Sequence, residues 1–362
     1  MDKKFSLCLV LILTILLISI VFYVIPIFNT SNSDSLSSLS LSSQVKYFSK
    51  EIGPRLAGSV NESRAASYLA TQFKKHGLET EIQEFKYYSL NSEEIKNSQN
   101  VVGTIKGVSP RQIIICADLD TVRDSAAGQY TEGANDDSSA LALMVGLAEK
   151  YQGSKPHYTI KLIAFGASEE PFTFPLITPP RTSLDPEAYY KIVYTPYLVG
   201  ARTYVLDHQE ETENTLAVIS LEAPGVGEPC FVNEDAFVKN NDLMVNFLVN
   251  NARLQGINAH EIDFAAFDKS GREGAISHIY LPFSYAGIPS TFLTCMQSPD
   301  LNSAIHNQSE IPDYLTVQDN YENLVKNNGN EQNLENHLQM VLYVVKDSVD
   351  KLSAFYIMNE LI

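Results

Sequence analysis

The longest apolar run of the chain, residues 5–28, contains no charged side chain. A helix needs about 20 apolar residues to span a bilayer, so this run predicts a transmembrane helix. Lys3 and Lys4 precede it, and the positive-inside rule then places the N-terminus in the cytoplasm. No small-residue cleavage pattern follows, which favours an uncleaved signal anchor over a removed secretory signal.

The segment that follows, residues 29–43, is rich in serine and predicts a linker. Everything after it is therefore expected outside the cytoplasm, held at the cell membrane by a single span, or secreted if the apolar segment is cleaved.

From residue 44 onward the pattern is that of one folded α/β domain, residues 44–362, with no further linker. Two runs, residues 112–117 and 159–165, are apolar almost throughout, as strands covered on both faces are. Residues 138–151 between them, SSALALMVGLAEKY, predict a helix, and a strand–helix–strand order predicts an α/β fold. Further helices are predicted over residues 62–76, 243–254 and 334–356, and further strands over residues 82–88, 100–105, 217–221 and 291–294.

Composition excludes several classes of protein. The chain of 362 residues has 26 Lys and Arg against 43 Asp and Glu, a formal net charge of −17. Such a surface repels phosphate backbones, so we expect no nucleic-acid partner. Outside the apolar run there are only Cys116, Cys230 and Cys295, which excludes a disulfide-stapled scaffold and a four-cysteine zinc site. The chain also lacks the G-x-S-x-G turn of serine hydrolases.

Acidic residues recur at the ends of the predicted strands. Asp118 and Asp120 follow the first apolar strand, Glu169 and Glu170 follow the second, and Glu222 follows the third. Ligands bind at the carboxyl ends of strands in open α/β sheets. Any one of these acids could be a solvated loop charge, but their ordered recurrence, together with Asp136 and His306, indicates a site for divalent metal ions.

Six ordered segments resemble the zinc aminopeptidases of the bacterial leucyl aminopeptidase and aminopeptidase Y type, whose superfamily includes glutamate carboxypeptidase and glutaminyl cyclase. The resemblance implies a zinc-exopeptidase-like α/β/α sandwich with a central mixed, largely parallel sheet flanked by helices. The similar segments are IGPRLAGS at 52–59, NVVGTIKG at 100–107, GANDDSSALALMVGLAE at 133–149, IAFGASEEPF at 163–172, LVGARTY at 198–204 and SHIYLPFSYAGI at 277–288.

The resemblance implies a site for one or two zinc ions. Asp136 would bridge both ions. Glu170 and His306 would complete the ligands of one ion, and Asp118 and Glu222 those of the other.

The resemblance also implies a function. Glu169 would be the general base that takes a proton from the attacking water. Asp120 and His278 are expected to lie beside the ligands without binding the ion. The implied activity is that of a membrane-anchored metallo-aminopeptidase acting on peptides.

Three features depart from the family pattern. Asp118 stands where the family has histidine, so one ion would be held by three carboxylates, which suits a weaker zinc site or a harder divalent ion. Ile305 stands where many members have a tyrosine. Ser277 and His278 are adjacent, without the aspartate that the family has between them. Two other readings therefore stay open, a glutaminyl-cyclase-like acyl transferase and a catalytically inactive peptidase-like ectodomain that binds a partner.

Overall fold

The computed structural model describes residues 39–90, 92–171, 173–176, 184–234, 242–265, 278–297, 306–307 and 311–360. One compact unit covers Ser40–Ile362. The predicted membrane-spanning segment, residues 5–28, lies outside the described residues, and inside them we find no helix long and apolar enough to cross a bilayer. The first helix, α2 (Leu41–Lys46), begins within the predicted linker, because Ser40 caps it and Leu41 and Ser42 are buried.

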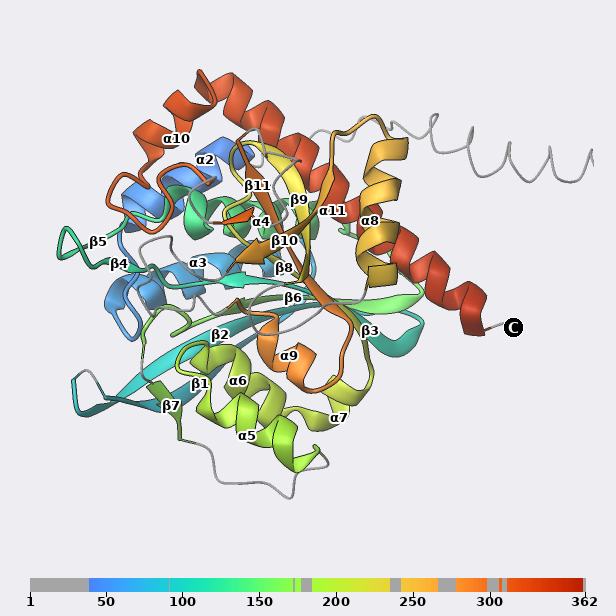
Figure 1. Cartoon of the computed structure of the whole chain (residues 1–362), viewed down its shortest axis with the longest axis horizontal. Coiled ribbons are helices and arrows are strands. Elements are labelled where there is room, and N and C mark those ends of the chain that lie inside the picture. The colour runs from blue at the N-terminus through green and yellow to red at the C-terminus, as the bar shows by residue number, and fades with distance from the viewer. Residues whose placement is uncertain are drawn as a thin grey trace, which may run out of the picture. The chain divides into compact units, whose positions relative to one another are not determined.

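A mixed β-sheet forms the centre of the unit (Figure 1). Four strands in its middle, β6, β3, β8 and β11, run parallel, whereas β2, β1 and β7 add antiparallel strands at one edge. This confirms the predicted class of a mixed α/β sheet flanked by helices. In order across the described sheet, the strands are β12 (His306–Asn307), β10 (His260–Ala265), β9 (Glu228–Glu234), β11 (Ser290–Met296), β8 (Thr215–Leu221), β3 (Ser109–Asp118), β6 (Tyr158–Phe165), β2 (Glu94–Ile105), β1 (Glu79–Ser89) and β7 (Thr173–Pro175).

Both faces of the sheet are covered by helices, as the apolar runs predicted. In β3, Ile113 and Ile115 pack into the apolar cluster on one face, and Ile114 and Cys116 into the cluster on the other. Figure 1 shows α5, α6 and α9 together on one side of the sheet and α2, α4 and α11 on the other. The remaining described elements have these bounds: η2 (Tyr47–Ile52), α3 (Val60–Lys75), β4 (Arg123–Asp124), β5 (Gln129–Tyr130), η3 (Ala134–Ser139), α4 (Ala140–Lys150), α5 (Pro186–Tyr194), α6 (Val199–Asp207), α7 (Gln209–Glu213), α8 (Asp242–Leu254), α9 (Leu281–Tyr285), α10 (Tyr321–Asn327) and α11 (Glu331–Glu360).

Helix α3 shows why the local sequence folds as predicted. Ser59 accepts a hydrogen bond from the Glu62 N–H at 3.2 Å, and the Glu62 carboxylate reaches back to the Gly58 N–H at 2.7 Å. This reciprocal capping satisfies N–H groups at the helix start that have no partner within the helix. Gly77, at φ 83°, ends the segment in a left-handed conformation that glycine adopts without strain.

Candidate active site

The carboxyl ends of three neighbouring parallel strands carry predicted site residues. β3 ends at Asp118, Glu222 directly follows β8, and Glu169 lies in the turn after β6. Because β8, β3 and β6 are adjacent in the sheet, these side chains share one edge of it. Asp118 and Glu222 are each only 4% exposed.

Asp136 lies in the turn η3 between this sheet edge and α4. The backbone N–H groups of Asn135 and Asp136 donate to the two carboxylate oxygens of Asp319, at 2.7 and 3.0 Å. Gly133, at φ 61°, begins the turn, and a Cβ there would lie 2.5 Å from a neighbouring side chain. The turn therefore requires glycine at its start.

Asp137 ties this turn to two strand ends. Its Oδ2 accepts a hydrogen bond from the Asp118 N–H at 3.0 Å, and its Oδ1 accepts one from the Ala223 N–H at 3.1 Å. The peptide bond between Asp136 and Asp137 is cis. The sequence alone gave Asp137 no role in holding the two strand ends, although its place directly after the predicted ligand Asp136 pointed to the site.

Asp120 positions the turn that carries Glu169. Its Oδ1 accepts a hydrogen bond from the Ser168 N–H at 2.8 Å, and its Oδ2 accepts one from the Glu169 N–H at 3.1 Å. Asp120 is 1% exposed, so these bonds are shielded from water. The structure thus places Asp120 beside the predicted base, in contact with its backbone.

Glu222 forms a buried pair with His278. His278 Nδ1 lies 2.8 Å from Glu222 Oε2, and the imidazole stacks on Phe292 at 4.1 Å between ring centroids. His278 therefore fixes the orientation of the Glu222 carboxylate.

The carboxylate of Glu170 is bound by side chains of the neighbouring antiparallel strands. Its carboxylate accepts hydrogen bonds from Tyr87 at 2.6 Å, Ser89 at 2.7 Å and Lys96 at 2.7 Å, all on β1 and β2. The structure thus separates two adjacent glutamates: Glu169 lies with the strand-end acids, and Glu170 is neutralised by Lys96.

The strand-end acids act strongly on one another. Burial raises the pKa of Asp118, Asp136 and Glu169 well above the usual range, and neighbouring carboxylates raise it further. Like charges held this closely out of water are unfavourable in the ionised state, and a bound cation would relieve the repulsion.

The donor set fits a divalent cation. Asp118 Oδ1 and Glu222 Oε1 are buried and accept no hydrogen bond from the described residues. Carboxylate oxygens of this kind are ligands for zinc and for harder divalent ions. In the same described part of the chain, no three His, Cys, Asp or Glu side chains converge into a ready-made metal site.

His306 is placed only by its backbone, which forms β12 and pairs with Phe264 of β10. Its side chain lies outside the described residues, as does the segment 298–305 that precedes it.

A buried arginine beneath the site was also missed from the sequence. Arg55 is fully buried, and its guanidinium donates to the carbonyls of Leu119 at 2.9 Å and Phe48 at 3.1 Å. Burial lowers its pKa to about 10, while the charges of Asp137 and Asp319 act in the opposite direction. Arg55 therefore supplies fixed positive charge near the acids. In the sequence, its place in the segment IGPRLAGS (52–59) was the one feature that pointed to it.

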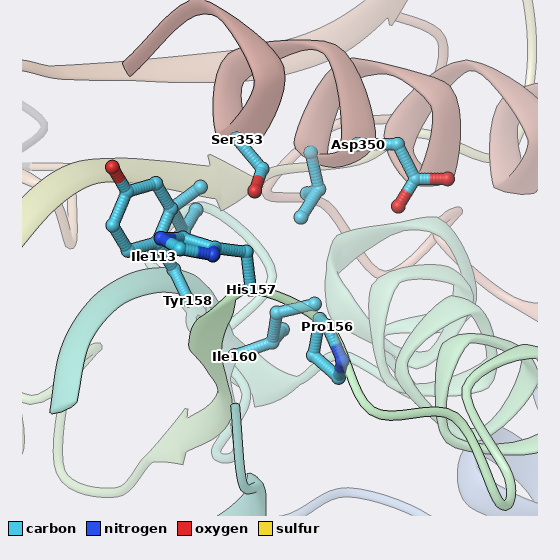
Figure 2. A pocket seen from close by; sticks show the side chains of 8 residues that line it. Ile113, Pro156, His157, Tyr158, Ile160, Asp350 and Ser353 are labelled. Atoms are coloured by element: carbon cyan, nitrogen blue, oxygen red, sulfur yellow. The ribbon is translucent and has the colours of Figure 1, made fainter. Parts of the chain in front are cut away.

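A cavity of about 160 Å³ lies elsewhere in the fold. Figure 2 shows it between the starts of β3 and β6 and the helix α11, with Ile113, Tyr158, Asp350 and Ser353 in its wall. Five residues of extended strand, about 16 Å, separate Ile113 from Asp118, so the cavity is distinct from the acidic site.

The protein has a mixed sheet flanked by helices, with buried carboxylates at the ends of its parallel strands. This arrangement is that of a metal-dependent peptidase. The chain belongs to peptidase family M28, whose family model matches residues 100–341.

Solved structures share the fold. BSAP, a zinc aminopeptidase from Bacillus subtilis, is 15% identical, with 88% of this chain and 97% of that chain covered and a TM-score of 0.60. A Zn-dependent exopeptidase from Parabacteroides distasonis is 19% identical, with 84% and 96% covered and a TM-score of 0.61. The glutaminyl cyclase of Porphyromonas gingivalis is 16% identical, with 88% and 99% covered and a TM-score of 0.63.

A curated relative matches part of the chain. The alkaline phosphatase isozyme conversion protein of Escherichia coli K12 is 29% identical over 142 residues, 35% of this chain and 41% of that protein. The match thus spans about two fifths of the relative's length.

Proposed function

We propose that this protein is a metal-dependent aminopeptidase that releases N-terminal residues from peptides. One observation carries the proposal: Asp120 holds Glu169 by its backbone at the sheet edge where Asp118 and Glu222 are buried. A site with this excess of negative charge would attract the free α-ammonium group of a peptide. That attraction favours cleavage at the N-terminus over cleavage within the chain.

Asp118, Asp136 and Glu222 would hold one divalent ion, with zinc as the first candidate. When bound, zinc polarises the scissile carbonyl and lowers the pKa of a water toward neutrality. A second ion at Asp136 and His306 would have Glu170 as a ligand only if that carboxylate left Lys96. The contacts of Glu170 therefore support one tightly bound ion.

Glu169 would then move the protons of the reaction. As the water oxygen bonds to the carbonyl carbon, Glu169 takes a proton from the water, and the carbonyl π electrons move onto the carbonyl oxygen. When the C–N bond breaks, Glu169 gives that proton to the departing amine. Asp120 keeps Glu169 in place throughout by its hydrogen bonds to the turn.

The test is hydrolysis of a panel of aminoacyl p-nitroanilides by the purified protein, before and after a chelator and with single metals added back. We expect Glu169→Gln to lower kcat roughly 10²–10⁴-fold, the usual contribution of a general base. The control is Glu79→Gln, because Glu79 is exposed and, among the described residues, pairs with Lys106 alone. Full activity in Glu169→Gln, or activity indifferent to the chelator, would refute the mechanism.

Two alternatives are outcomes of the same study. Peptides with N-terminal Gln are assayed for pyroglutamate, because glutaminyl cyclases share this fold. Pyroglutamate formation without release of amino acids would indicate an acyl transferase. Absence of both products with every metal would indicate a peptidase-like binding domain.

The location of the protein is a separate proposal. The 24 uncharged residues 5–28, preceded by two lysines, support a single membrane anchor with the peptidase domain outside the cytoplasm. Fractionation of cells expressing the full chain and protease treatment from outside would test it. Recovery of the intact full chain in the cytosol would refute it.

A further inference from the structure

The turn after β6, residues 166–169, carries the predicted base, and its four backbone N–H groups all donate to side chains. Asn100 Oδ1 accepts from the first at 3.2 Å, and Glu62 Oε1 accepts from the second, that of Ala167, at 3.2 Å. Asp120 accepts from the last two at 2.8 and 3.1 Å. Side chains from α3, from β2 and from the residues just after β3 therefore hold one turn of the chain.

The carbonyl groups of the same turn are fixed as well. Those of residues 166–168 accept hydrogen bonds from the N–H groups of Gly200, Val199 and Leu198 at the start of α6, each at 3.1 Å. Ala167, in the middle of the turn, is left-handed at φ 50°. A non-glycine residue keeps such a strained conformation only where the surrounding contacts impose it. The form of the turn therefore depends on the groups that hold it.

Glu62 serves this turn as well as its own helix. Its Oε2 accepts from the Gly58 N–H and completes the reciprocal cap of α3. Its Oε1 accepts from the Ala167 N–H and, at 2.7 Å, from the Ser98 hydroxyl. A Cβ on Gly166 would lie 2.6 Å from this Oε1, so the turn packs directly against the carboxyl. Glu62 is 0% exposed, and a buried carboxyl needs such hydrogen bonds to offset its loss of water.

We propose that Glu62 is a positioning residue for the general base Glu169. This inference rests on the proposed peptidase function. Without an acceptor for its N–H, Ala167 would relax from its left-handed conformation, and the peptide units that follow would rotate with it. Glu169 would then move relative to Asp118 and Glu222, beside which it meets the attacking water. A displacement of about 1 Å at a reacting group lowers a rate by up to about 10²-fold.

The first test compares Glu62→Leu with Ser59→Ala. Glu62→Leu removes the hydrogen bonds of the carboxyl to the helix start and to the turn, whereas Ser59→Ala removes only the other half of the cap. We expect Glu62→Leu to lower kcat on an aminoacyl p-nitroanilide roughly 10–100-fold, with KM changed less than about threefold. Ser59→Ala should lower Tm and keep kcat. An equal fall of kcat in both variants, or no fall in either, would overturn the proposal.

Two conservative variants test which contact matters. Glu62→Gln keeps an oxygen that accepts from Ala167 and Ser98, so kcat should stay within about threefold of the unaltered protein. Glu62→Asp keeps a carboxylate at the helix start, where it is favourable, but is one methylene too short to hold Gly58 and Ala167 together. It should lower kcat as Glu62→Leu does, and it takes the place of that variant if Glu62→Leu does not fold. Full activity in Glu62→Asp together with a low kcat in Glu62→Gln would contradict the assignment.

A second background separates positioning from a general loss of structure. Because Glu62 acts through Glu169, its substitution should cost little once the base is gone. In Glu169→Gln, we expect Glu62→Leu to change kcat less than about twofold. A fall as large as in the unaltered background would overturn the role of Glu62 and leave the proposed function standing. An unaltered protein that releases no amino acid with any metal would overturn the proposed function and this inference with it.

Discussion

The carboxylate of Asp120 and the backbone of Glu169 are joined by a hydrogen bond of 3.1 Å, although the two residues are 49 positions apart. The same carboxylate accepts from Ser168. One side chain just past the end of β3 therefore sets the conformation of the turn after β6 and, with it, the position of the backbone that carries the predicted base.

Asp120→Ala should lower both the stability of the fold and the activity of the site. The change leaves the buried N–H groups of Ser168 and Glu169 without acceptors, at a cost of about 1–3 kcal/mol each. Glu169 would also lose its fixed position, so kcat should fall roughly 10–100-fold. Kinetics and urea unfolding of the same preparation measure both effects. Unchanged kcat despite lowered stability would show that Glu169 does not depend on Asp120.

Arg55→Met should destabilise the whole domain. The change leaves the Leu119 and Phe48 carbonyls without their buried donor and removes positive charge close to Asp137 and Asp319. Each buried acceptor left unpaired costs about 1–3 kcal/mol. Urea unfolding at neutral pH measures the effect, with the exposed Arg64→Met as control. A fall of less than about 1 kcal/mol in the free energy of unfolding would show that Arg55 does not stabilise the domain.

The central part of the fold could be predicted from sequence because its signals are local. β3 and β6 contain largely apolar runs with β-branched residues, and α4 between them is rich in Ala and Leu. The acids at the strand ends were visible for the same reason, since each lies at the end of its strand or in the turn just after it. Short elements such as α9 and β12 carry too few residues to show a period.

Contacts between distant residues could not be predicted. Asp319 and Asp136 are 183 positions apart, and His278 and Glu222 are 56 apart. The sequence also presents Glu169 and Glu170 as chemically equal neighbours. The contacts of Glu170 with Tyr87, Ser89 and Lys96 on β1 and β2, which depend on the packed sheet, distinguish them.

The stability of the metal-free protein should fall as the pH rises from about 4.5 to 8. Burial raises the pKa of Glu62 from 4.5 to about 8, and the charge of Asp120 contributes. The folded state then holds a proton that the unfolded state releases above pH 4.5, so the folded state is progressively disfavoured until the pH passes the folded pKa. The free energy of unfolding should fall by several kcal/mol over this range, at about 1.4 kcal/mol per unit by which the pKa is raised.

Glu62→Gln, which cannot titrate, should flatten this dependence. The measurement is the free energy of unfolding in urea at a series of pH values in the presence of a chelator. Equal slopes for Glu62→Gln and the unaltered protein would mean that other acids produce the effect.

Metal titration should distinguish the two adjacent glutamates. Because Glu170 is held by Tyr87, Ser89 and Lys96, we expect Glu170→Gln to change zinc affinity less than about threefold. Asp136→Asn removes a carboxylate from the strand-end group itself and should weaken binding at least roughly 10–100-fold. Competition with a chromophoric chelator measures both affinities, and elemental analysis should find about one zinc per chain. Two tightly held zinc ions, together with loss of one in Glu170→Gln, would show that Glu170 leaves Lys96 when metal binds, as the family resemblance implies.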